Sequence, residues 1–468
     1  SSVPVDGSFR LADAVYTPGR EGATPVPVRE LAAKFRWADR ELALPEVTLE
    51  TPVLGASGAG RIYRAADAEY HLSLDTNARA ADAGALIGRF EKQVSIEGGR
   101  VDGKLLIDVP MRNFQGLAVS GTLEVAGAKV AQKIAPLGVE SLEARSLALE
   151  FSGGGRHWDV KRLALDAPGL EALLDGSVEN GRIEANVHVK SARWAAPETL
   201  PLSGGSVEIA GRLAGELKGA QGLQFAGQVS LDGATPRYTS PKLALTGGTL
   251  NLTARGEGPV ADPLAWVRSG EASAAGVRLG LPGQEARPVQ SAALAFRRDG
   301  DGFAIENVRA TASGLQAQGN GRWSDAGYRF DGRVELANVA QLGLKLPEGT
   351  GVKQVRVTGS LAGSRSQPLL TASGRLEVDG ARVQLAGAPA QSLDRLTGNL
   401  RFAEGTLHVE KLEGRIPAGS FVVDGEWSSE ALKARVVALA EDVSKLGIEL
   451  PEGFAVKSVR LDAQVSGT

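Results

Sequence analysis

Apolar residues alternate with polar ones over short stretches along most of the chain. Val207, Ile209 and Leu213 occupy one set of alternate positions, and Glu208 and Arg212 occupy the other. A period of two predicts β-strands with one apolar face. Asp-Gly, Gly-Gly and Asn-Gly pairs between such stretches predict short hairpin turns. We therefore expect an all-β chain of mainly antiparallel strands.

Helices are expected at only a few places, and all of them are short. The candidates lie near 80–90, 192–199, 263–266, 338–343 and 441–446. No long segment shows the 3.6-residue period of an amphipathic helix. Helices therefore cannot form a layer that covers the apolar face of the sheet.

A first signature, an anchor glycine followed by alternating hydrophobic residues, occurs four times. The anchor glycines are Gly7, Gly121, Gly227 and Gly374, in steps of 114, 106 and 147 residues. An extra segment at about 240–288, with added strands and a Gly/Pro-rich turn, explains the long third step. Without it the period is roughly 105–110 residues, which indicates a repeat architecture.

A second signature has apolar residues at positions 1, 3, 6 and 8 and follows the first, second and fourth anchors by about 35 residues, whereas the insertion lengthens the third spacing. Its copies begin at Leu42, Trp158, Phe303 and Leu407. The three-residue step in the middle predicts a β-bulge or a strand break. Two further markers repeat: the glycines Gly60, Gly176, Gly321 and Gly425, and a match of 339–356 with 443–460 that is 104 residues away.

These markers predict four repeat units, at 1–118, 119–223, 224–370 and 371–468, with the 240–288 insertion in the third and the fourth truncated. No Pro/Ser-rich linker separates the units, so we expect one continuous sheet, elongated and curled into a groove. Both ends of the sequence lie inside the repeating pattern. We therefore expect a fragment of a longer chain.

The apolar face of such a sheet needs a cover, which is either a second sheet or a ligand. Leu, Val, Ala and Ile dominate that face and aromatic residues make up only 5% of the chain, which favours a groove for aliphatic chains. A closed, dry core is the alternative. The expected groove lining is Leu44, Val160, Val207, Ile209, Ile305, Val355, Val357, Leu376, Val378, Leu407 and Val409.

Composition excludes several classes of protein. The 468 residues include no cysteine, so disulfide scaffolds, thiolate metal sites and cysteine nucleophiles are excluded. A net charge of −3 argues against nucleic-acid binding, which needs a basic face. The sequence contains no run of 18 apolar residues, so no membrane-spanning helix is expected in it.

The sequence contains no set of residues that we expect to act in catalysis, bind a cofactor or ligate a metal. Residues 299–302 are acidic but lack the flanking helices of a calcium loop, and we expect a hairpin turn. The glycine-rich segments 55–60 and 152–155 lack a following helix for phosphate, so turns are expected there too. The histidines lack ligand spacing and are expected to face solvent: His71, His157, His188 and His408. We expect a protein that is not an enzyme.

Residues 407–427 read Leu-x-Val-x-x-Leu-x-Gly and then Phe-Val-Val-Asp-Gly-Glu-Trp. Together with residues 372–383 and their three partner copies, this stretch resembles the repeats of the AsmA-like family of bacterial envelope proteins, which includes AsmA, TamB and YhdP. The resemblance implies a periplasmic β-groove, open along one side, that carries phospholipids between the inner and outer membranes of a Gram-negative cell. It also implies an inner-membrane anchor and membrane contacts in segments outside this sequence.

Two alternatives belong to other functional classes. A TamB-like scaffold would assist assembly of outer-membrane proteins by strand addition at its sheet edges. An extended structural β-solenoid would repeat every 20–30 residues, which the longer period here does not favour. Each alternative allows further protein partners in the cell envelope, which the sequence does not identify.

Overall fold

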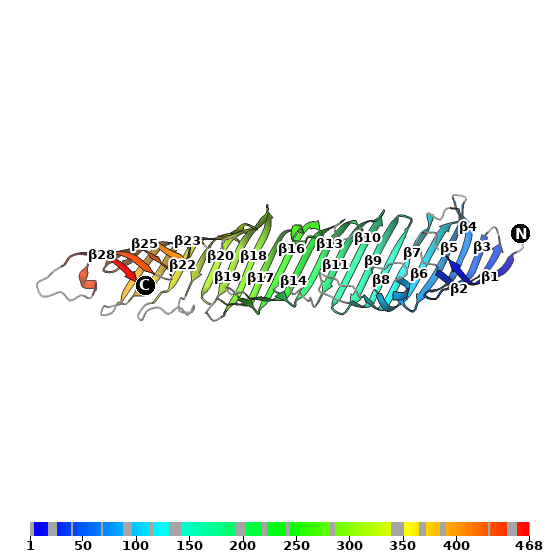
Figure 1. Ribbon diagram of the computed structural model, residues 1–468, viewed down its shortest axis with the longest axis horizontal. Coiled ribbons are helices and arrows are strands. Elements are labelled where there is room, and N and C mark those ends of the chain that lie inside the picture. The colour runs from blue at the N-terminus through cyan, green and yellow to red at the C-terminus, as the bar shows by residue number, and fades with distance from the viewer. Residues whose placement is uncertain are drawn as a thin grey trace. The chain divides into compact units, whose positions relative to one another are not determined.

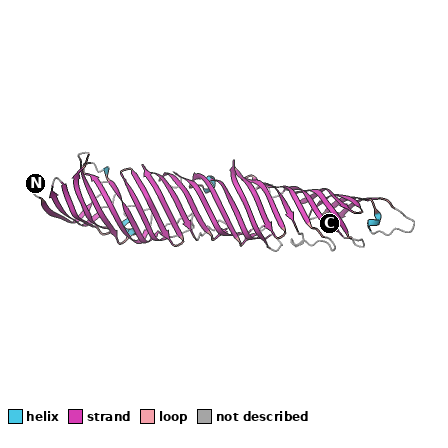
Figure 2. Ribbon diagram, turned by 180° about the vertical axis from the view of Figure 1, so that it is seen from behind, coloured by secondary structure: helices cyan, strands magenta, loops and turns pink. Residues whose placement is uncertain are grey.

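The computed structural model describes residues 4–16, 26–38, 41–66, 69–87, 96–112, 116–130, 142–192, 202–217, 222–239, 244–280, 286–337, 351–364, 371–383, 390–428, 431–446 and 456–467. Most of these residues lie in β-strands, and Figure 2 shows how few helical turns interrupt them. The predicted all-β class is confirmed.

The strands from the first anchor to the end of the second predicted unit are β1 (Val5–Tyr16), β2 (Val26–Ala38), β3 (Glu41–Glu50), β4 (Gly55–Arg64), β5 (Tyr70–Ala80), β6 (Ile96–Pro110), β7 (Ala118–Val130), β8 (Leu142–Gly154), β9 (His157–Ala167), β10 (Leu170–Glu179), β11 (Arg182–Ser191), β12 (Leu202–Ser203) and β13 (Ser206–Glu216).

The remaining strands are β14 (Leu223–Thr239), β15 (Ala244–Thr246), β16 (Thr249–Pro259), β17 (Val267–Gly280), β18 (Arg287–Asp299), β19 (Gly302–Ala312), β20 (Leu315–Trp323), β21 (Gly327–Leu336), β22 (Gln354–Ser364), β23 (Thr371–Val383), β24 (Gln391–Ala403), β25 (Thr406–Ile416), β26 (Gly419–Trp427), β27 (Leu432–Ala440) and β28 (Val459–Gly467).

Most strands pair antiparallel with the next strand in the chain, as Figure 1 shows, and hydrogen bonds join all 28 into one sheet. The short strands β12 and β15 are the exceptions, because β11 pairs with β13 and β14 also pairs with β16. The chain forms two compact units, 1–234 with 254–267 and 235–253 with 268–468. The boundaries of the four sequence repeats stay a prediction.

Three of the expected helices lie in the described residues. Helix α1 (Ala83–Ile87) falls in the 80–90 window, and α2 (Pro263–Trp266) begins after Asp262, whose carboxylate accepts a hydrogen bond from the Ala265 N–H. The third is η5 (Val443–Leu446), a turn of 3-10 helix. The candidates near 192–199 and 338–343 lie almost wholly outside the described residues.

The second signature contains the bulge that its three-residue step predicts. In all four copies the pairing register shifts at that step: between Leu44 and Val47, Val160 and Leu163, Ile305 and Val308, and Val409 and Leu412. In the last two copies the bulge contains a residue with a positive φ, which is Asn307 in one and Lys411 in the other. Their N–H groups donate to Asn320 and Asp424, thirteen residues later in each case.

The four strands of the first signature share a left-handed residue six positions after the anchor glycine. These residues are Asp13, Gly127, Gly233 and Gly380, with φ between 50° and 69°. Strand β17 has the same arrangement, with Gly270 followed by Gly276 at φ 65°. This fifth anchor strand lacks the alternating Leu and Val residues of the other four. Its anchor precedes Gly374 by 104 residues, the spacing of the longest sequence match.

One glycine-rich segment differs from expectation. Residues 55–60 form the first half of β4 and not a turn. Gly58 and Gly60 face the neighbouring strand so closely that a Cβ at either position would collide with the backbone of β5. The other two expectations are confirmed, because residues 152–155 end β8 and enter its hairpin, and 299–302 close the β18–β19 hairpin.

Candidate functional site

In each unit one face of the sheet is apolar. Directly opposed residues of antiparallel strands project to the same side, so the pairing register identifies each row of side chains. In the second unit one such row consists of Ile305, Gly321, Phe330, Leu361, Ala372, Phe402, Leu407 and Trp427. In the first unit a comparable row consists of Leu44, Gly60, Leu74, Ile107, Val119, Gly153, Trp158 and Val178.

The structure places every residue of the predicted lining on this apolar face of its unit. The first unit contributes Leu44, Val160, Val207 and Ile209. The second contributes Ile305, Val355, Val357, Leu376, Val378, Leu407 and Val409. The alternation of apolar and polar residues in the sequence was enough to assign these residues to one face. That they line a lipid path stays a prediction.

These apolar side chains are mostly half-buried. Of the predicted lining, Leu44, Val207 and Val378 are buried and the others keep part of their surface exposed. Most buried apolar residues of the described chain are alanines, and no large side chain within the described ranges is completely buried. A closed sandwich would bury Leu, Val and Phe completely between its two layers. Side chains that stay half-exposed indicate a face that no second sheet covers.

The exposed aromatic residues and the buried clusters of the apolar face lie at opposite ends of the strands. At one margin, which we call the aromatic margin, Trp37 and Tyr70 in the first unit and Trp323 and Trp427 in the second are exposed, Trp427 by 62%. They occupy the apolar face beside the first residues of the second signature, since Trp37 is opposite Leu42 and Trp427 is opposite Leu407. A tryptophan side chain combines a large apolar ring with a polar N–H. It suits a boundary between hydrocarbon and water.

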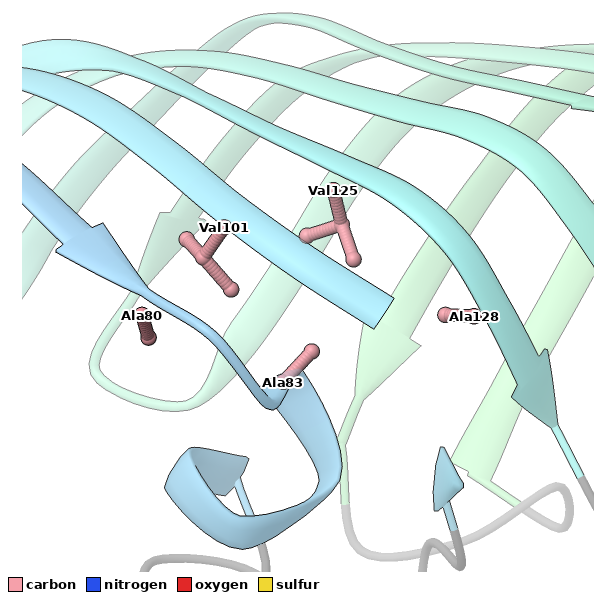
Figure 3. Packing of buried hydrophobic residues seen from close by; sticks show 5 residues of the cluster. All are labelled: Ala80, Ala83, Val101, Val125 and Ala128. Carbon is pink, nitrogen blue, oxygen red and sulfur yellow. The ribbon is translucent and has the colours of Figure 1, made fainter. Parts of the chain in front are cut away.

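The opposite margin is packed closely, and Figure 3 shows how this is done in the first unit. Ala83 at the start of α1 packs with Ala80, Val101, Val125 and Ala128, all of them buried. In the second unit the same margin holds a cluster of Val378, Ala381 and Leu393. Each unit therefore has a closed margin and an exposed one.

The apolar face of the second unit contains a hollow of ≈ 480 Å³. Its floor consists of one glycine from each of four successive strands: Gly319, Gly332, Gly359 and Gly374. Val308 and Leu400 lie at the two ends of the same row. A Cβ at Gly359 would collide with the carbonyl oxygen of Ser373 on the next strand. Glycine is therefore required for the close approach of the strands, and the missing side chains leave the space open.

The reverse face of the sheet is polar and bears ion pairs. Arg356 bridges Glu335 and Glu377 at 3.2 and 3.1 Å, and Arg395 adds a second contact to Glu377 at 3.0 Å. The hydrogen bond from Arg356 is the main cause that lowers the pKa of Glu377. Hydrogen bonds from Arg333 and Arg356 lower the pKa of Glu335 in the same way. The lowered pKa values keep both carboxylates ionised at neutral pH.

The histidines lie on the polar face, where His157 is exposed and His188 and His408 are partly exposed to solvent. His71 is different, because its side chain is only 15% exposed. Its Nδ1 lies 2.6 Å from Oδ1 of Asp108, and the Tyr63 hydroxyl donates to the other oxygen of that carboxylate. The expectation that all four histidines face solvent was therefore wrong for His71. The pairing of β5 with β6 brings these residues together.

Nothing in the described part of the chain gathers three side chains of the kind that ligate a metal. Within the same residues no helix has the length and apolarity that crossing a bilayer requires. No protein-family model matches the chain, and no curated protein matches it.

Proposed function

We propose that this protein is a non-enzymatic carrier of phospholipids, with the acyl chains held on the apolar face of the sheet. The observation that supports this most directly is that the face is continuous in each unit and only half-buried. Soluble proteins seldom leave large apolar patches uncovered unless something binds to them. Rows of Leu, Val, Phe and Gly present no directional polar groups, so the ligand they fit is aliphatic.

The two margins suggest how a lipid would lie. Acyl chains would occupy the apolar rows towards the closed margin, and the glycerol and headgroup would lie at the aromatic margin, where Trp323 and Trp427 are exposed. Covering hydrocarbon contributes about 0.8 kcal/mol for each methylene. A dozen half-covered methylenes would therefore contribute on the order of 5 kcal/mol, enough to hold a lipid and still let it move.

The proposed setting is the periplasm of a Gram-negative bacterium, with transfer between the inner and outer membranes. This part of the proposal is supported by the resemblance of residues 407–427 and 372–383 to AsmA-like repeats. In that setting membrane contacts and an inner-membrane anchor would be supplied by segments outside this sequence.

Mass spectrometry of lipids that co-purify with the chain tests this proposal. The protein would be produced in a Gram-negative host, purified without detergent, and extracted beside a mock preparation. We expect phospholipids at a constant ratio to protein across the elution peak. A preparation free of phospholipid that also fails to take up fluorescent phospholipid from vesicles would contradict the proposal.

A matched pair of variants makes the test specific for the apolar face. Leu376→Asp places a carboxylate in the predicted lining, and Arg375→Asp places one on the polar face of the same strand, one residue away. The first variant should carry less lipid per protein, and the second should carry as much as the unaltered chain. Equal lipid in both would show that the lipid binds elsewhere.

A further inference from the structure

The polar face of the second unit is hollowed along part of its length. One hollow of ≈ 870 Å³ lies over β19 to β25, and another of ≈ 460 Å³ lies over β16 to β19. The two adjoin, because Asn307 and Arg309 line both of them. Together they form a groove across ten strands, which we call the polar groove. Neighbouring strands are about 4.8 Å apart, so the groove is on the order of 40 Å long.

Short side chains form the floor of the polar groove. Asp331 lies opposite Ser360 in the strand pairing, and Ser360 lies opposite Ser373. The hydroxyl oxygens of the two serines are 3.0 Å apart. Over β18 the floor consists of Ala293 and Ala295. None of these side chains is long enough to fill the space over the sheet, which leaves a channel between longer neighbours.

Amide and guanidinium groups beside the floor keep hydrogen-bonding capacity. The side chains of Gln318, Asn399 and Arg401 line the groove and have no hydrogen-bond or ion-pair partner within the described part of the chain. Asn320 accepts a hydrogen bond from the Asn307 N–H through its amide oxygen, which leaves its NH₂ group available. Amides and hydroxyls both donate and accept hydrogen bonds. The lining therefore suits a ligand whose groups also do both.

The charges along the polar groove balance. Three arginines and three carboxylates line it: Arg309, Arg333, Arg401, Glu271, Asp331 and Glu410. A polyanion such as a nucleic acid would need a surplus of positive charge, which this lining lacks. Among the described residues no aromatic side chain lines the groove. The ligand that fits is therefore uncharged and held by hydrogen bonds along its length.

An extended peptide fits the polar groove less well than a chain of sugars. Peptides that add to a sheet pair with an exposed strand edge and place alternate side chains in pockets. The groove instead crosses strands whose backbones already pair on both sides, as β21 does with β20 and β22. A sugar needs no strand edge, because the several hydroxyl groups on each ring bond directly to amide, hydroxyl and carboxylate side chains.

We propose that the polar groove binds a linear, uncharged oligosaccharide that lies across the strands. Its hydroxyl groups bond to the amides of Gln318 and Asn399 and to the hydroxyls of Ser360 and Ser373. Affinity comes from the length of the chain, because each neutral hydrogen bond contributes little net free energy in water. The groove is on the opposite face from the proposed lipid surface, so this inference does not depend on lipid binding.

Titration calorimetry of the whole chain with cellohexaose and chitohexaose, both linear and uncharged, tests the proposal. The disaccharide cellobiose is the control for length. We expect at least one hexasaccharide to bind, and cellobiose to bind at least about tenfold more weakly because it makes fewer hydrogen bonds. Failure of both hexasaccharides to bind would overturn the proposal, also where a polar peptide of similar length binds instead. Equal affinities for cellobiose and the hexasaccharides would overturn it as well.

Matched variants locate the bound sugar. Gln318 lines the polar groove, whereas Gln316, two residues away on the same face of β20, lies outside the lining. Gln318→Ala should weaken hexasaccharide binding roughly three- to tenfold, the effect of one lost hydrogen bond, and Gln316→Ala should leave it unchanged. Ser373→Ile fills the floor and should abolish binding, with Thr371→Ile on the same face of β23 as its control.

Urea unfolding and lipid analysis of the same four variants separate this proposal from the others. All four should unfold cooperatively and carry as much lipid as the unaltered chain, because the substitutions lie on the polar face. Equal losses of sugar binding in Gln318→Ala and Gln316→Ala would refute the polar groove as the site. Full sugar binding by a folded Ser373→Ile protein would refute it too.

Discussion

Val409 and His408 are neighbours on β25 and project to opposite faces of the sheet. Val409 lies opposite Leu400 and Gly425 in the apolar row, and His408 lies 3.2 Å from the carboxylate of Glu426 on the polar face. One step along this strand therefore separates the proposed lipid surface from the surface in water. The pair offers a sharp test of whether the apolar face is covered.

Val409→Asp should reduce lipid retention strongly and lower the free energy of unfolding by less than about 2 kcal/mol, because a half-exposed carboxylate keeps part of its water. His408→Asn is the control and should change neither quantity. Urea unfolding and lipid analysis of both variants provide the measurement. A loss of stability above about 4 kcal/mol for Val409→Asp would instead indicate a closed core at this position.

The floor of the hollow in the second unit predicts a steric effect. In Gly359→Ala the new methyl group meets the backbone of β23 at Ser373 and must push the strand aside. We expect a loss of about 1–3 kcal/mol in the free energy of unfolding, the usual cost of overpacking. Gly467→Ala is the control, since a Cβ there has nothing within 4 Å. If both variants unfold at the same urea concentration, the close approach of β22 to β23 is not required.

Alternation and spacing predicted much of this fold from the sequence. A period of two was enough to assign Val355, Leu376 and Val409 to one face, because side chains on a strand alternate strictly. The three-residue step predicted the bulges, since an extra residue on one strand shifts the phase of that strand alone. Both are local properties of the backbone, which explains why they could be predicted.

Features that depend on the neighbouring strand could not be predicted in this way. Glycines in residues 55–60 suggested a turn, whereas Gly58 and Gly60 are needed for close packing against β5. His71 meets Asp108 only through the register of β5 with β6, 37 residues apart in the chain. The fifth anchor strand was missed because small residues follow Gly270 in place of Leu or Val, although its 104-residue spacing to Gly374 was a usable signal.

The bulge in the last copy of the second signature predicts different effects on stability for substitutions at Asp424 and at Lys411. Asp424→Ala removes the acceptor for the Lys411 N–H and should lower the free energy of unfolding by about 1 kcal/mol. Lys411→Gly should leave stability unchanged or raise it slightly, because glycine adopts a φ of 52° without strain. Chemical unfolding of both variants checks this. A larger loss for Lys411→Gly than for Asp424→Ala would contradict the role given to the left-handed residue.

The ion pairs of the polar face predict how stability depends on pH. Arg356, helped by Arg395, holds the pKa of Glu377 below its ordinary value of 4.5, so the folded chain binds this proton less readily than the unfolded chain. The stabilisation by Glu377 is therefore complete above that value and is lost as the pH falls through the lower pKa of the folded state. Glu377→Gln should be less stable than the unaltered chain at neutral pH, and the difference should shrink as the pH falls below 4.5. Urea unfolding at a series of pH values, with Glu404→Gln in the β24–β25 turn as the control, measures this. If the difference stays constant across the series, the carboxylate of Glu377 is not the group whose protonation weakens the fold.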